Sequence, residues 1–76
     1  MSFFSTFDLG LATVLSLSFP IESLNKSNSK KVEFVFKRQP GLDELVQRYW
    51  AKDLSVEPQL LFSNLKHLKN RLYSSF

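Results

Sequence analysis

Hydrophobic and polar residues alternate with two different periods along the chain, and the first period is helical. Apolar residues recur at helical spacing over residues 6–17, and Ser5 with Asp8 three positions later resembles a capping box. This pattern predicts a helix over residues 6–17 that ends before Pro20. Apolar residues leave little of the predicted helix surface polar, so we expect other elements to cover it. They are Phe7, Leu9, Leu11, Ala12, Val14, Leu15 and Leu17.

The period changes to strict alternation over residues 31–37. Val32, Phe34 and Phe36 share one face, while charged residues and Val35 share the other, which predicts a half-buried strand. The stretch "FPIESL" (residues 19–24) is a weaker strand candidate. "NKSNSK" (residues 25–30) has the Asn, Ser and Lys content of a solvated loop. We therefore predict a two-stranded β-hairpin with its tip at residues 25–30.

Helical spacing returns in the second half of the chain. A second helix is predicted after Pro40 and a third from about Glu57 and Pro58 to the C-terminus, each with one apolar stripe. The stripes are Leu42, Leu45, Val46, Tyr49 and Trp50 in the second helix, and Leu61, Leu65, Leu68 and Leu72 in the third. The predicted fold is a single α+β domain over residues 1–76, in the order α-β-β-α-α, with the hairpin packed against the helices.

Composition limits the chemistry that this domain can perform. A chain of 76 residues has room for one core, and a content of 43% hydrophobic residues with eight Phe is sufficient to form it. The chain has no cysteine and one histidine, so disulfides and the usual zinc sites are excluded, and we expect no metal or other cofactor.

The apolar run "LGLATVLSLSF" lies near the N-terminus, but it favours neither export nor membrane insertion. No base precedes it and Asp8 adjoins it, so a signal peptide is not expected. Its length is well below the roughly 20 residues of a membrane span. A cytoplasmic location without membrane association is expected.

The formal net charge of +3 is unevenly distributed. Residues 1–25 contain two acids and no base, whereas residues 26–76 contain ten bases and five acids. Such asymmetry is typical of a protein that contacts nucleic acid or another anionic surface, although +3 is also an ordinary charge for a small soluble domain.

The order of motifs "FSTFDLGLA", "VEFVFK", "LVQRYW" and "VEPQLLFSNLKHLKNRLY" resembles a small bacterial and phage-borne domain family without an assigned function. The resemblance covers nearly the whole chain. It implies a shared fold and brings no catalytic residues.

No catalytic constellation is evident in the sequence, so an enzyme is not expected. The adjacent acids Asp43 and Glu44 point about 100° apart on a helix, and they suit the positive end of its dipole. His67 has no acid three or four residues away to orient it and is interpreted as a surface residue.

Two groups of residues are candidates for binding an anion. Lys37 and Arg38 precede the start of the second helix, where backbone N–H groups favour anions, although Asp43 and Glu44 oppose this. In the third helix, aromatic and basic residues alternate along one flank of the apolar stripe, and aromatic stacking with phosphate contacts suits nucleic acid. The residues concerned are Phe62, Lys66, Lys69 and Tyr73, with Arg71 nearby. The same residues could also form a core edge and a helix cap.

These observations favour a non-catalytic accessory module that binds nucleic acid or a nucleic-acid-handling protein. The alternative is a protein-interaction or homodimerisation module without nucleic acid, including a small phage-type inhibitor. In that alternative, Trp50 is an anchor for a partner if its indole is exposed, and an unpaired strand edge can recruit a second chain.

Overall fold

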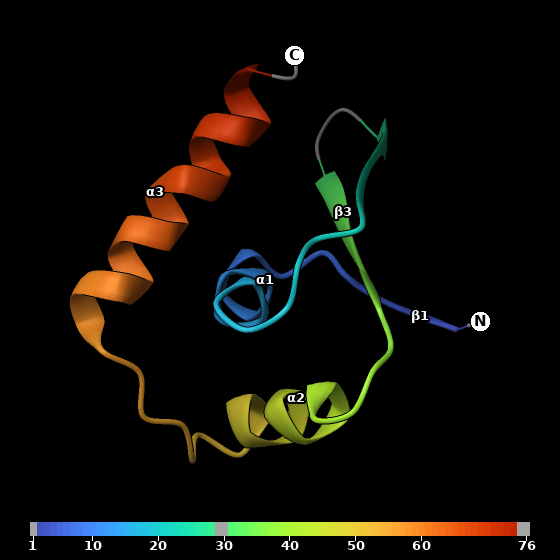
Figure 1. Ribbon diagram of the computed structural model, residues 1–76. Coiled ribbons are helices and arrows are strands. Elements are labelled where there is room, and N and C mark those ends of the chain that lie inside the picture. The colour runs from blue at the N-terminus through green and yellow to red at the C-terminus, as the bar shows by residue number, and fades with distance from the viewer. Residues whose placement is uncertain (1, 29–30, 75–76) are drawn as a thin grey trace.

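The computed structural model describes residues 2–28 and 31–74, which form six elements in the order β1-α1-β2-β3-α2-α3 (Figure 1). The strands are Phe3–Thr6 (β1), Ser23–Asn28 (β2) and Lys31–Lys37 (β3). The helices are Leu9–Ser16 (α1), Leu42–Trp50 (α2) and Pro58–Ser74 (α3). The predicted α+β class is confirmed.

The three strands form an antiparallel sheet in the order β1-β3-β2, with β3 in the middle. Phe36 pairs with Phe4 of β1, and Phe34 pairs with Thr6 of β1 and Leu24 of β2. The side chains of Phe34 and Phe36 are buried, as their alternation with charged neighbours predicts. The sheet therefore has one face in the core, whereas its other face is open to solvent.

The order α-β-β-α-α with a two-stranded hairpin was wrong in detail, because β1 precedes the first helix and adds a third strand. The bounds of the first hairpin strand were also wrong. It was predicted within residues 19–24, but β2 begins at Ser23 and includes residues 25–28 of the predicted loop. Pairing with β3 imposes strand geometry on this polar stretch. A register irregularity between Asn25 and Asn28 accommodates it. Residues 29 and 30 of the predicted tip lie outside the described residues.

The start of the first helix also differs from the prediction. Asp8, not Ser5, is the N-cap of α1, and its Oδ1 accepts a hydrogen bond from the Leu11 backbone N–H at 3.0 Å. Ser5 cannot cap the helix because it pairs with Val35 in the sheet. Phe7 lies before the helix and is exposed instead of joining its apolar stripe.

Helix α1 is the centre of the fold. Figure 1 shows it nearly end-on, with the sheet to its right, α3 to its left and α2 below it. Residues 11–15 of α1 are all buried, in agreement with the prediction that this helix is largely covered. The core cluster joins all the layers and consists of Leu11, Ala12, Leu15, Phe34, Phe36, Leu42 and Leu68.

Helix α2 ends in a left-handed turn at a residue that is poorly suited to it. Lys52 has a φ of 59°, and its backbone N–H donates to the Tyr49 carbonyl at 3.2 Å. Glycine adopts this conformation without the steric cost that a Cβ atom imposes.

We expect Lys52→Gly to raise the free energy of unfolding by about 0.5 kcal/mol or more, and the melting temperature by about 2–8 °C. Thermal denaturation followed by circular dichroism measures this change. Lys52→Ala is the matched control, because it removes the charge but keeps the Cβ atom. An equal gain from both variants would show that strain is not the cause.

None of the helices in residues 2–28 and 31–74 combines the length and the apolar character needed to cross a membrane.

Candidate functional site

The whole formal net charge of the protein resides on α3. The chain has ten Lys and Arg residues against seven acids, and three of those bases lie within Pro58–Ser74, which contains no acid. The remaining seven bases and seven acids cancel. Helix α3 therefore presents a positive surface on an otherwise balanced domain.

The rotation of α3 about its axis is fixed by contacts with α1. Leu68 is buried in the core, and Asn64 Nδ2 donates to the Thr13 carbonyl oxygen at 3.2 Å and to Ser16 Oγ. At the N-terminus of α3, the Glu57 carboxylate accepts from the backbone N–H groups of Gln59 and Leu60, at 3.1 and 2.8 Å. These contacts determine which residues of α3 face solvent.

Four of the predicted site residues lie together on one side of α3, and we call them the basic-aromatic flank. They are Phe62, Lys66, Lys69 and Tyr73. At about 100° per residue, they fall within one sector of about 60° beside the buried face. The Phe62 and Tyr73 side chains are 66% and 75% exposed, and both lysines are exposed. Within the described part of the chain, neither lysine forms an ion pair.

Arg71 does not belong to the basic-aromatic flank. It is two residues from Lys69, so its side chain leaves the helix about 160° away from that of Lys69. His67 is exposed, as predicted, and lies with Leu60, Ser63 and Asn64 beside Leu17 at a shallow depression on this other flank. Helical spacing along α3 therefore separates Arg71 from the two lysines with which it was grouped as a candidate site residue.

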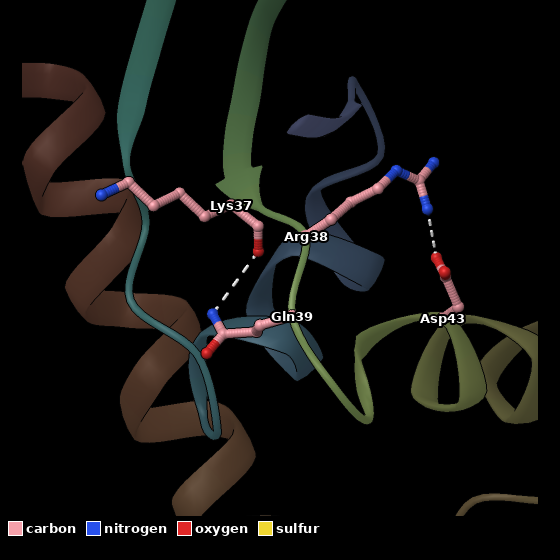
Figure 2. A network of polar contacts seen from close by, with 4 residues as sticks. All are labelled: Lys37, Arg38, Gln39 and Asp43. Carbon is pink, nitrogen blue, oxygen red and sulfur yellow. Dashed lines mark hydrogen bonds and ion pairs between the residues drawn. The ribbon is translucent and has the colours of Figure 1, made fainter. Parts of the chain in front are cut away.

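Lys37 and Arg38 point away from each other (Figure 2). Lys37 forms an ion pair with Glu22 at 3.7 Å, and Arg38 forms one with Asp43. The Arg38 guanidinium also lies 5.6 Å from the centre of the Phe4 ring. The two side chains do not converge on one point, and each is paired with an acid of this chain.

An apolar groove of about 180 Å³ lies between the helices, beside the basic-aromatic flank. It contains residues from all three helices: Gly10, Thr13 and Val14 of α1, Tyr49 of α2, and Leu61, Phe62 and Leu65 of α3. Phe62 thus belongs to the flank and also to the wall of the groove. The Thr13 hydroxyl donates to the Leu9 carbonyl at 2.7 Å, so it is occupied within α1.

The Tyr49 hydroxyl closes one side of the groove through a contact with Asp8. Burial raises the pKa of Tyr49 above its ordinary value of 10.0, and the charge of Asp8 and a hydrogen bond to it act in the same direction. Ionisation of Tyr49 is thus harder in the folded state. We expect the stability that this contact gives to be intact below pH 10 and to fall as the pH rises through the raised pKa.

Gly10 permits this contact, because a Cβ atom at position 10 would lie 2.6 Å from the Tyr49 hydroxyl oxygen. In an exposed helix interior, Gly→Ala is stabilising by about 0.5–1 kcal/mol. We expect Gly10→Ala to be destabilising in this protein, because the new methyl group displaces the hydroxyl from Asp8. In a Tyr49→Phe background the nearest clash is gone, and the same change should be neutral or stabilising.

Urea denaturation of the parent, the two single variants and the double variant tests this coupling. We expect an interaction free energy of about 1 kcal/mol or more. If the two changes are additive, the close approach of Gly10 to Tyr49 has no energetic consequence.

Trp50 is 60% exposed, although helical spacing places it on the apolar face of α2. Its ring packs edge-to-face against Tyr49, with 5.1 Å between ring centres. It lies next in sequence to a residue of the groove. The condition under which Trp50 is a candidate anchor for a partner, an exposed indole, is therefore met.

The groove and the roles of Asn64 and Tyr49 were missed from the sequence. One signal for them was present in Gly10, since a glycine inside a helical pattern costs about 1 kcal/mol relative to alanine and can reflect a packing requirement. Among the described residues, no three His, Cys, Asp or Glu side chains lie close enough together to hold a metal ion.

Comparison with known proteins finds one family. The model of a domain of unknown function, DUF5659, matches residues 1–74. No curated protein and no solved structure matches the chain.

Proposed function

The chain belongs to this family of domains of unknown function, and we propose that it is a non-catalytic accessory module that binds nucleic acid through the basic-aromatic flank of α3. The observation that carries the proposal is the exposure of Phe62 and Tyr73 on the same side of α3 as two lysines without acidic partners in the described chain. A cytoplasmic location is part of the proposal.

The exposure of the aromatic rings supports this function over a purely structural role. A core-edge residue keeps most of its ring covered, yet most of the Phe62 and Tyr73 surface faces solvent. Lys66 follows Phe62 by four residues, and Tyr73 follows Lys69 by four, so each ring is a neighbour of one ammonium group. This spacing lets a base stack on a ring while its phosphate contacts the adjacent lysine.

Fluorescence anisotropy with labelled single-stranded and double-stranded DNA, at low and moderate salt, tests the proposal. We expect the parent protein to bind, with an affinity that falls as salt increases. Absence of binding by the folded parent at low salt would overturn the proposal.

We expect Phe62→Leu with Tyr73→Leu to weaken single-stranded binding by about tenfold or more, and duplex binding much less, since stacking contributes about 1–3 kcal/mol per base. Leu60→Ala is a control that also removes exposed apolar surface from α3, but on the opposite flank. Equal losses on single and double strands would remove stacking from the proposal.

A second candidate function is protein interaction, and the exposed indole of Trp50 favours it. An aromatic ring held against Tyr49 and exposed to solvent is typical of a binding anchor. Strands β1 and β2 are the outer strands of the sheet, so either edge could pair with another chain to form a homodimer. Sedimentation of the parent and of Trp50→Ala over a range of concentrations tests the homodimer.

A further inference from the structure

The groove beside the basic-aromatic flank has properties that the proposed function does not use. Its walls come from three helices, it is mostly apolar, and its volume of about 180 Å³ is well below the roughly 300–1,000 Å³ of sites for drug-sized molecules. The occupant must therefore be a single flat or compact apolar group.

The charge on the α3 side of the groove favours an occupant attached to anions, and the Asp8 carboxylate on the Tyr49 side is engaged by the Tyr49 hydroxyl. Leu65 of the groove wall precedes Lys69 by four residues, and Phe62 of the wall precedes Lys66 by four, so both lysines lie one turn from the groove. A symmetric dimer through this groove would place two equally basic α3 helices side by side, and repulsion disfavours that arrangement. A nucleotide meets both requirements, since its base is flat and largely apolar on its faces and its phosphate is anionic.

We propose that the groove holds one unstacked base of a single-stranded nucleic acid, with the adjoining phosphates on Lys66 and Lys69. This inference rests on the proposed function and adds to it the class of nucleic acid and the position of one base. Phe62 provides the ring on which that base or its neighbour stacks, since it belongs to the groove and to the flank.

The polar groups around the groove indicate how the base is recognised. The Thr13 hydroxyl donates to a backbone carbonyl, and the Tyr49 hydroxyl is engaged with Asp8. Neither hydroxyl has its proton available to a base without losing an internal contact, so the groove has little capacity to distinguish one base edge from another. We therefore infer binding through stacking and shape, with weak sequence preference.

Amide chemical-shift mapping by NMR tests the position of the base in the parent protein. The probes are a short oligothymidylate and a chain of the same length that has abasic sites throughout. We expect oligothymidylate to shift the amides of Gly10, Thr13 and Val14 in α1 as well as those of α3. The abasic chain should shift α3 alone. If oligothymidylate binds but leaves the α1 amides unmoved, the groove is not a base site, while the proposed function stands.

A groove-filling variant gives an independent measurement. Leu65→Phe places a ring in the groove, and we expect it to weaken oligothymidylate binding by about tenfold without changing the affinity for the abasic chain. Leu60→Phe adds the same ring on the opposite flank and should bind as the parent does. Equal affinities for the two variants would overturn the inference.

Two further results would also overturn the inference. Failure of the parent to bind either chain removes the proposed function together with it. Shifts of the groove amides on titration with an acidic peptide containing one Phe, but not with oligothymidylate, would assign the groove to a protein partner. Thermal melts of both variants show whether each is folded in these measurements.

Discussion

Replacing Phe34 by Asp is expected to abolish folding of the domain. Phe34 is 2% exposed on the inner face of β3, and the core residues around it are Phe36 of the same strand and residues of α1, α2 and α3. Removal of a large buried aromatic side chain by itself costs about 3–5 kcal/mol. A carboxylate in the same position adds the cost of an unpaired buried charge. At about 0.05–0.15 kcal/mol per residue, the total stability of a chain of this size is about 4–11 kcal/mol.

The neighbouring residue provides a matched control. Val35 faces the opposite side of the sheet, between Ser5 of β1 and Ser23 of β2, and it is partly exposed. Val35→Asp introduces the same charge one position away and should lower the melting temperature without abolishing the transition. Far-ultraviolet circular dichroism and thermal melts measure both variants. A cooperative transition of Phe34→Asp near the parent temperature would show that this face of β3 is not the core.

The alternating pattern predicted β3 because the two features that define this strand, its period and its apolar inner face, can be read from its own residues. Its residues have the right period, and its inner face is apolar enough to define which side is buried. Strand β1 has neither property. Its four residues are too few to display a period, and Ser5 with Asp8 also fits the start of a helix. Phe3–Thr6 becomes a strand because β3 offers an open edge, at which Phe4 pairs with Phe36.

The polar strand β2 also could not be predicted from its own residues. The sequence Ser23–Asn28 contains one apolar residue, Leu24, and its composition is that of a loop. Its strand geometry comes from pairing with β3. The Asn25 side chain adds to that pairing by donating to Glu33 Oε1 at 3.2 Å. The neighbouring strand β3 thus decides its structure, and the pattern within residues 23–28 alone cannot include that pairing.

The candidate site, too, could be predicted from the sequence only in part. Helical spacing alone places Phe62, Lys66, Lys69 and Tyr73 on one flank, and it also separates Arg71 from them. The exposure of the flank depends on Asn64 and Leu68, which orient α3 against α1. The groove depends on three helices that are far apart in the chain, so no spacing rule could predict it.

Removal of the two lysine charges from the flank is expected to produce a large loss of nucleic-acid affinity with little loss of stability. Lys66 and Lys69 are exposed and form no ion pair within the described residues, so Lys66→Gln with Lys69→Gln should change the free energy of unfolding by less than about 1 kcal/mol. If each lysine contacts one phosphate, the slope of log affinity against log salt should become shallower. The change is about 1.4 on a single strand and about 1.8 on a duplex. Binding should weaken nearly uniformly across sequences, because phosphate contacts carry no sequence information.

The matched control is Lys37→Gln with Lys52→Gln, which lowers the net charge equally but at positions away from α3. Lys37 forms an ion pair with Glu22 beside the sheet, and Lys52 follows the end of α2. If the overall charge of the protein attracted nucleic acid, both pairs of changes would weaken binding alike. Because Pro58–Ser74 contains three bases and no acid, we expect anisotropy titrations to show a much larger loss for the α3 pair. Equal losses would show that the affinity comes from the net charge of the protein and not from the basic-aromatic flank. Lys66 and Lys69 would then no longer be site residues.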